Sequence, residues 1–392
     1  MQQSGESFKK SLLDTYAPYT FAIFGITTLL IVRGALFYHE WGDFSHFLQP
    51  WVERYRTMTF WEGLGTRVGN YNPPYMYILN IIARIGVSEL ILIKLVSVFF
   101  DFLIAFFVMK IVSLKTESVN MRLLAFILTL AIPTMILNSS MWAQCDSIYS
   151  AFAVGSLYFG LTKRSKLAYV FMGLAFSFKM QAVFMMPMLL VFIFMKRISI
   201  KDCYLFFAVY IATLLPAVIA GMSFGAVIST YFNQAGTYSE LNMNIANIWR
   251  LAGNVPYENF LVVGLCIAAL AVLGLIYFTY VNRERLVSNV NFIRLAYLFV
   301  IIMPFLLPKM HDRYYFLADV MSVLVFLFDK KRWFVPLISI FCSYLAYAWF
   351  LMSRLEIIDQ KLAALALLAV ILVVLRDYVM SLYSGKYSDT ID

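Results

Sequence analysis

Polar residues that could bind or activate a substrate gather in five short segments of this chain of 392 residues. The segments are Asp43 to His46, Trp142-Ala-Gln-Cys-Asp146, Lys179-Met-Gln181, Asn242 to Asn247 and His311-Asp-Arg-Tyr314. Each lies at the end of an apolar stretch or interrupts one. Carboxylates can act as general bases, and lysine and arginine bind anions such as phosphate. Whether the five segments can form one site depends on the elements that place them.

Asp43 is the candidate general base. It lies five residues after the first apolar stretch, where its carboxylate could take a proton from a hydroxyl whose oxygen attacks an activated carbon. A solvated carboxylate without a role is an equally ordinary interpretation. His46 follows three residues later, on the same face if this segment is helical. It could orient Asp43 or bind substrate, or it could have no role.

Two segments carry candidate phosphate-binding residues. Lys179, followed by Gln181, interrupts an apolar stretch, and a lysine that faces lipid costs roughly 2.5–3.5 kcal/mol. Lys179 therefore faces a cavity or an anion, unless its side chain snorkels to the surface. Arg313 could bind phosphate oxygens in a bidentate fork at the start of a helix. His311 and Lys309 lie beside it; the alternative is that these charges only anchor the helix.

Two segments are candidates for sugar recognition. Trp142 could pack against the C–H face of a sugar while Gln144 and Asp146 bond its hydroxyls; capping of a helix is the other use of such residues. Asn244 and Asn247 form a polar face in an outer loop, and asparagine also serves in turns. Tyr314, beside Arg313, joins the sugar-binding candidates. Further residues have open readings: Tyr71-Asn-Pro-Pro-Tyr75 is a rigid turn or an aromatic shelf, and Asp101 and Asp319 fall inside apolar stretches, where each needs a partner.

The composition requires a membrane protein. The chain is 62% hydrophobic and 14% charged, whereas soluble domains are roughly half apolar and a quarter charged. A soluble core could not bury so many apolar stretches, so we predict an all-α polytopic membrane protein with one membrane domain over residues 1–392. The net charge of +9 lies in short clusters between spans. The lipid bilayer is therefore an expected partner, and nucleic acid is not.

The apolar stretches predict where the chain crosses the membrane. Candidate spans are 17–38, 89–111, 122–138, 145–161, 203–222, 259–281, 294–308, 314–328, 333–352 and 360–376. The stretch 167–195 is long for one span and is interrupted at Lys179, so we expect a hairpin of two short helices with Lys179 at the turn. A single long, tilted span is the alternative. Together these elements predict a bundle of about 10–12 transmembrane helices.

The basic residues predict the orientation. Cytoplasmic clusters would be Lys9/Lys10, Lys110/Lys115/Arg122, Lys163/Arg164/Lys166, Lys196/Arg197/Lys201, Arg283/Arg285/Arg294, Lys330/Lys331/Arg332 and Arg376/Lys386. This holds only if 73–86 does not cross the membrane, and its length is well short of the ~20 residues that a span needs. Both termini are then cytoplasmic. The outer face receives a first loop, 39–88, with interfacial helices, a second loop, 223–258, and all five polar segments.

These residues, in this order, resemble the GT-C class of integral-membrane glycosyltransferases. More narrowly, the chain is similar to bacterial relatives of GPI mannosyltransferase II and of the catalytic subunit of GPI mannosyltransferase I. The matching pieces are Gly42-Asp43, Tyr71-Asn-Pro-Pro-Tyr75, Lys94 to Asp101, Trp142-Ala-Gln-Cys-Asp146, Phe178-Lys-Met-Gln181, Asn244 to Trp249 and His311-Asp-Arg-Tyr314. The usual Gly-Gln pair reads Ala143-Gln144 here, and the usual His-Glu-Arg reads His311-Asp312-Arg313.

The resemblance implies an enzyme that uses a sugar carried on a polyprenyl phosphate, at the outer face, typically with inversion. It implies that Asp43 is the base and that Arg313, His311 and Lys179 hold the donor phosphate. The leading hypothesis is therefore a hexosyltransferase of the cell envelope, mannose or a similar sugar being moved to a lipid-linked or surface glycan. A transporter or flippase of lipid-linked sugars is the alternative. No cofactor is required, although Asp43 and Asp146 could share a divalent cation if they approach each other.

Overall fold

The computed structural model describes residues 2–236 and 238–384, and nearly all of its regular structure is helical. The prediction of an all-α polytopic membrane protein is confirmed. The strands in the described part of the chain are two residues long: β1 (Asn242–Met243) pairs in parallel with β2 (Met310–His311). This small pairing brings two of the five polar segments together although they are far apart in sequence.

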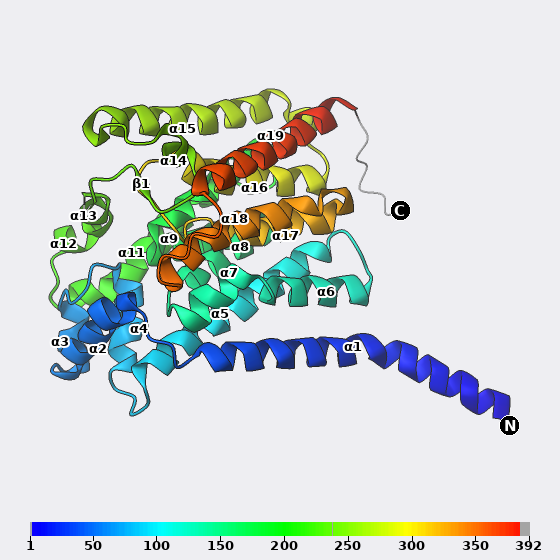
Figure 1. The fold of residues 1–392 in the computed structure, drawn as a ribbon, viewed down its shortest axis with the longest axis horizontal. Helices are drawn as coiled ribbons and strands as arrows, with labels where there is room; N and C mark the ends of the chain where they lie inside the picture. The colour runs from blue at the N-terminus through cyan, green and yellow to red at the C-terminus, as the bar shows by residue number, and fades with distance from the viewer. Residues whose placement is uncertain (1, 237, 385–392) are drawn as a thin grey trace.

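Long apolar helices form the body of the molecule. Within the described residues, seven helices are long and apolar enough to cross a membrane. They contain α1 (Gln2–Leu36), α5 (Glu89–Val112), α11 (Tyr204–Ile219), α15 (Tyr257–Val281), α16 (Asn289–Leu306), α18 (Phe334–Leu351) and α19 (Gln360–Ser384). They run along the long axis of the molecule (Figure 1). Such helices suit a bilayer because each satisfies its backbone hydrogen bonds internally.

The remaining expected spans are bent or short. α6 (Val119–Leu130) is followed by α7 (Pro133–Ile136) and a π-helical turn to Met141, with a bend of 53°. Pro133 causes the break because it has no N–H to continue the first helix. The pair would make an eighth span. α8 (Asp146–Leu161), α9 (Ser165–Phe178), α10 (Pro187–Phe194) and α17 (Phe316–Phe328) are shorter. A total of 10–12 is therefore reached only if these short helices are also counted.

The stretch around Lys179 is a hairpin, as predicted. α9 ends at Phe178, Lys179 is extended (φ −153°, ψ 137°), and a 3₁₀ turn over Met180–Phe184 leads to α10. The chain then returns to the start of α9, where the Ser199 N–H donates to Ser165 Oγ over 2.9 Å. Non-helical backbone at this depth requires a protein environment, and the hairpin has one between α8, α11 and α16.

Short helices gather at one end of the bundle. α2 (Gln49–Arg56), α3 (Phe60–Gly65), α4 (Pro73–Ile82), α12 (Phe224–Ile228) and α13 (Thr230–Gly236) lie together at the left of Figure 1. α4 has 10 residues, half of what a span needs, so 73–86 does not form a transmembrane helix. α3 packs closely on the end of α11, since a Cβ at Gly65 would lie 2.1 Å from the Ala220 oxygen.

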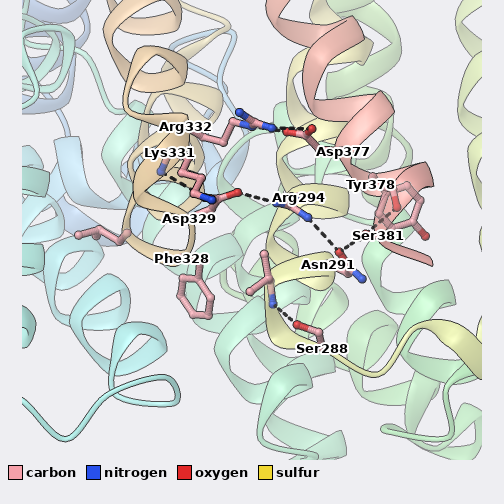
Figure 2. A network of polar contacts seen from close by, with 12 residues as sticks. Ser288, Asn291, Arg294, Phe328, Asp329, Lys331, Arg332, Asp377, Tyr378 and Ser381 are labelled. Atoms are coloured by element: carbon pink, nitrogen blue, oxygen red, sulfur yellow. Dashed lines mark hydrogen bonds and ion pairs between the residues drawn. The ribbon is translucent and has the colours of Figure 1, made fainter. Parts of the chain in front are cut away.

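Charged residues tie the helices together at the opposite end (Figure 2). Arg294 of α16 pairs with Asp329 after α17 over 2.7 Å, and Arg332 before α18 pairs with Asp377 of α19. α1 begins and α19 ends at this same end (Figure 1). The basic clusters at 294, 330–332 and 376 therefore lie opposite the short helices, in agreement with the predicted threading. Lys386 lies outside the described residues.

The sidedness of the bundle is testable with single cysteines. In a chain whose four native cysteines are replaced by alanine, we expect a membrane-impermeant maleimide to label Arg67→Cys on intact cells. It should label Glu284→Cys only after permeabilisation, because Arg67 and Glu284 are exposed at opposite ends of the bundle. The reverse pattern would place the short helices in the cytoplasm and contradict the outer location of the polar segments.

Candidate active site

Asp43 lies in a prepared hydrogen-bonding position just after α1. Its Oδ2 accepts a hydrogen bond from Trp142 Nε1 over 3.1 Å and another from Gln144 Nε2 over 2.7 Å. Its side chain is 25% exposed, so the carboxylate remains within reach of a ligand. The two N–H donors fix the orientation of the carboxylate. The predicted base and two predicted sugar-binding residues therefore belong to one cluster.

The backbone of the segment 139–146 explains why both donors reach Asp43. Ala143 has a left-handed conformation (φ 60°), which residues with a Cβ rarely adopt. The reversal is stabilised because the Gln144 N–H donates to the Asn138 oxygen over 2.9 Å. The Trp142 ring is then held by stacking on Phe350, with ring centroids 4.4 Å apart. Strained backbone conformations of this kind are often found at functional sites.

A second set of charges surrounds Asp146. Lys179 Nζ lies 2.6 Å from Asp146 Oδ1, and Asn138 Nδ2 donates to Asp146 Oδ2 over 3.1 Å. Asp146 is fully buried, so a paired cation is needed to offset the loss of hydration. The lysine that interrupts an apolar stretch therefore faces an internal anion, and the anion is a side chain of the protein itself.

Arg313 joins the two sets of charges. Its Nε lies 3.5 Å from Asp146 Oδ2, and its Nη1 lies 3.9 Å from Asp43 Oδ2 and 3.7 Å from Asp312 Oδ1. The guanidinium carbon lies 5.3 Å from the centre of the Trp142 ring, a favourable cation–π distance. Four of the five polar segments thus meet around one arginine, at the junction of residues that are distant in sequence.

Burial sets the protonation of the two residues before Arg313. It raises the pKa of Asp312 to about 7, and the Arg313 guanidinium opposes this rise. It lowers the pKa of His311 to about 3, and Arg313 and Lys179 lower it further. His311 is therefore neutral at physiological pH. It could bind a phosphate through a ring N–H, but it would bring no positive charge.

Other predicted site residues lie around this centre. His311 is packed between the rings of Tyr238 and Tyr314, at centroid distances of 5.1 and 5.2 Å. The Tyr314 ring centre is 6.0 Å from Lys179 Nζ. Gln181 is buried, and its Oε1 has no hydrogen-bond partner in the described structure. A buried acceptor of this kind favours a bound ligand or water.

Two predicted basic or polar residues have contacts elsewhere. Lys309 Nζ lies over the ring of Tyr257 at 5.1 Å from its centroid. His46 is exposed, and its Nδ1 lies 2.7 Å from the Gly42 oxygen, which can only accept a hydrogen bond. His46 thereby stabilises the turn that carries Asp43.

The asparagine-rich segment supports the fold around the site. Asn247 is fully buried and caps α14 (Ile248–Ala252), accepting from the backbone N–H groups of Trp249 and Arg250. Asn244 Oδ1 accepts from Gln360 Nε2 over 2.8 Å and from Arg250 Nη2 over 3.3 Å. These contacts join the loop to the start of α19, which is the plain structural use of asparagine that the sequence left open.

Tyr71 is a site residue that the sequence left between two readings. Burial raises the pKa of its phenol well above the ordinary value, with Cys145, Arg313, Asp146 and Asp43 all close enough to contribute. Its ring also contacts Trp51 and Tyr75, at centroid distances of 6.0 and 5.0 Å. The rigid Pro-Pro turn that follows Tyr71 was the available signal for a fixed position. Asn138, in contrast, had no distinguishing signal in the sequence.

Comparison with known proteins adds no family. No protein-family model matches the sequence, and no curated protein matches it significantly. The resemblance to GT-C glycosyltransferases therefore stays a prediction that rests on the motifs.

The surroundings of Asp43 and Asp146 bear on the hypothesis of a shared divalent cation, which stays a prediction. Among the described residues, no group of three or more His, Cys, Asp or Glu side chains could hold a metal ion. Asp43 and Asp146 both lie near the Arg313 guanidinium, at 3.9 and 3.5 Å from its nitrogens. The arginine supplies one positive charge to both carboxylates without a metal ion.

The pairing of Lys179 with Asp146 predicts a large loss of stability on substitution. Lys179→Met should lower the free energy of unfolding by about 3–5 kcal/mol, because it leaves a buried carboxylate without its cation. Thermal unfolding in detergent would measure the loss. Lys201→Met, at an exposed lysine of α11's preceding turn, is the control. Equal melting temperatures for the two variants would contradict the pairing.

Asp312 predicts a pH dependence of stability. Its ordinary pKa of 3.8 rises to about 7 in the folded protein, so the folded state holds the proton that the unfolded chain releases. The free energy of unfolding of the wild type, relative to that of Asp312→Asn, should therefore fall by at most about 4 kcal/mol as pH rises from about 4 to 7. Above pH 7 the difference should stay constant. His311 has the opposite effect below pH 6.5, but both proteins retain it. If the melting temperature changed equally between pH 5 and pH 8 in the wild type and in Asp312→Asn, the burial of Asp312 would be contradicted.

Proposed function

We propose that this protein is an integral-membrane glycosyltransferase that moves a hexose, mannose or a similar sugar, from a polyprenyl-phosphate donor to a lipid-linked or cell-surface glycan. One observation carries the proposal: a partly exposed carboxylate, Asp43, is held by two N–H donors within 4 Å of the guanidinium of Arg313. A base for the acceptor and a cation for the leaving phosphate are the two groups that this transfer requires. We place the site on the outer face of the cell membrane, with both termini in the cytoplasm.

The transfer would be a single displacement. The acceptor hydroxyl gives its proton to Asp43 while its oxygen forms a bond to C1 of the sugar. The bond from C1 to the phosphate oxygen breaks on the opposite side, its electron pair leaves with the lipid phosphate, and the configuration at C1 is inverted. Trp142 and Gln144 bond one oxygen of Asp43. They thereby orient the carboxylate and leave its other oxygen to receive the proton.

The cations of the site would serve the leaving phosphate. Arg313 contacts Asp146 through Nε at 3.5 Å, and its terminal Nη groups can form a fork with phosphate oxygens. Lys179 is already paired with Asp146, so it acts on the phosphate by adding positive charge to the site or by exchanging partners. Buried charges act strongly because little water screens them.

The position of the cluster supports a transferase over the alternative, a transporter or flippase of lipid-linked sugars. A transporter places its binding groups near the middle of the membrane. Here Asp43 follows the end of α1, and Asp146, Lys179 and Arg313 each lie at a break or an end of a helix. The mid-helix Asp101 is paired with Arg33 over 2.8 Å, so its charge is satisfied within the protein.

Substitution of Asp43 tests the proposal. Purified protein in lipid nanodiscs would be given a panel of polyprenyl-phosphate sugars and glycolipid acceptors. With the productive pair, Asp43→Asn should lower turnover at least about 100-fold while donor binding persists, because the amide cannot accept the proton. Glu53→Gln, at an exposed carboxylate of the same outer loop, should retain full turnover.

Two outcomes would overturn the proposal. Unchanged turnover in Asp43→Asn would remove the base. Movement of a lipid-linked sugar across proteoliposomes without any glycosidic product would establish the transporter.

A further inference from the structure

One face of α5 carries three buried polar side chains, which we call the α5 polar face: Lys94, Ser97 and Asp101. Their exposed fractions are 0, 1 and 0%. The spacing of three and four residues places them in one row along the helix. Polar groups in the interior of a membrane protein are costly unless each finds a partner. The partners of all three belong to the two segments that meet at Asp43.

Lys94 holds the segment that leads to Asp43. Its Nζ donates to the backbone oxygens of Leu36, Phe37 and His39, over 3.1, 2.8 and 2.7 Å. Leu36 ends α1, and the last carbonyls of a helix lack partners within it. A buried ammonium satisfies these carbonyls and complements the negative end of the helix dipole. The chain is thereby fixed four residues before Asp43.

Ser97 and Asp101 hold the segment that carries the two donors to Asp43. Ser97 Oγ donates to the Gln144 oxygen over 2.7 Å. Asp101 accepts from Ser147 Oγ on one oxygen and from Arg33 on the other.

Arg33 extends this hold on both segments at once. It also donates to Ser139 Oγ, over 2.9 Å. Arg33 lies in α1 and bonds both Asp101 of α5 and Ser139 of the segment that carries the donors. It therefore joins α1 and that segment to the α5 polar face.

We infer that the α5 polar face sets the geometry between Asp43 and its donors, so that Lys94, Ser97 and Asp101 are positioning residues for the reaction. None of them is among the hydrogen-bond partners of the Asp43 carboxylate in the described structure. They fix the backbone that leads to Asp43 and the backbone that carries its two donors, Trp142 and Gln144. The consequence for turnover rests on the proposed function, whereas the consequence for Asp43 itself does not.

Ser97→Ala is the sharpest test because it removes one hydroxyl and retains the packing of α5. Ser113→Ala is the matched control: Ser113 follows the other end of α5 and also donates to a backbone oxygen, that of Lys110 over 2.7 Å. Trp142→Phe, which removes one donor to Asp43 directly, is the positive control. All four proteins would be purified in lipid nanodiscs and shown to be folded by thermal unfolding.

The first measurement is the rate at which a water-soluble carbodiimide modifies Asp43, followed by peptide mass spectrometry near pH 6. When its two hydrogen bonds are loosened, the Asp43 carboxyl group becomes more accessible to the reagent. We expect Ser97→Ala to be modified several-fold faster than the wild type, as Trp142→Phe is, and Ser113→Ala to match the wild type. Equal rates in Ser97→Ala and the wild type would overturn the inference.

The second measurement separates kcat from KM. A misplaced base slows the chemical step without weakening the binding of the donor, so Ser97→Ala should lower kcat about tenfold and leave KM within about twofold. A rise in KM alone would overturn the positioning role. If the wild type transfers no sugar from any donor, the proposed function fails, and the modification rate of Asp43 still decides the inference.

Discussion

The ion pair between Arg33 and Asp101 is the interaction on which the placement of Asp43 depends. Only 11% of the most apolar stretch of α1, within Tyr16–Leu36, is buried inside the protein. Packing therefore holds this helix weakly. An ion pair inside a membrane protein resists separation more strongly than such packing does, because separation leaves two charges in a medium that cannot hydrate them. Arg33 is 1% exposed and contacts α5, the end of α6 and the π-helical turn. The helix that delivers Asp43 is thus held at a defined register.

The same constraint explains the composition of the site. Arg313 and Lys179 bring two positive charges, and Asp43 and Asp146 bring two negative ones. Asp312 adds a third carboxyl whose pKa, about 7, lets it hold or release a proton near neutral pH. A nearly neutral set of buried charges is stable without a ligand, yet it offers directed N–H groups to an incoming anion. The neutral His311 fits this arrangement because a third buried cation would be repelled by Arg313.

Short helices inside the bundle make room for these polar groups. α8 and α17 are surrounded by protein, with nearly every residue buried. Their ends can therefore carry charges that a lipid-facing span could not. Asp146 starts α8, Lys179 follows the end of α9 and Arg313 precedes α17, so three helix ends converge on one volume. The longer helices outside supply the contact with lipid.

The sequence by itself determined the class of fold, the break at Lys179 and the short α4, and it singled out Asp43, Asp146, Lys179 and Arg313, which the structure brings together. These features depend on local hydropathy, on proline and on the spacing of charges, all of which can be read along the chain. Only the tertiary structure decided the partners. Lys179 pairs with Asp146, Lys309 turns to Tyr257, Asn247 caps a helix, and Tyr71 joins the charged cluster. The reason is physical: the energy of a buried charge depends on groups within a few ångströms, and the folded chain brings those groups from positions such as 43 and 144 that are far apart in sequence.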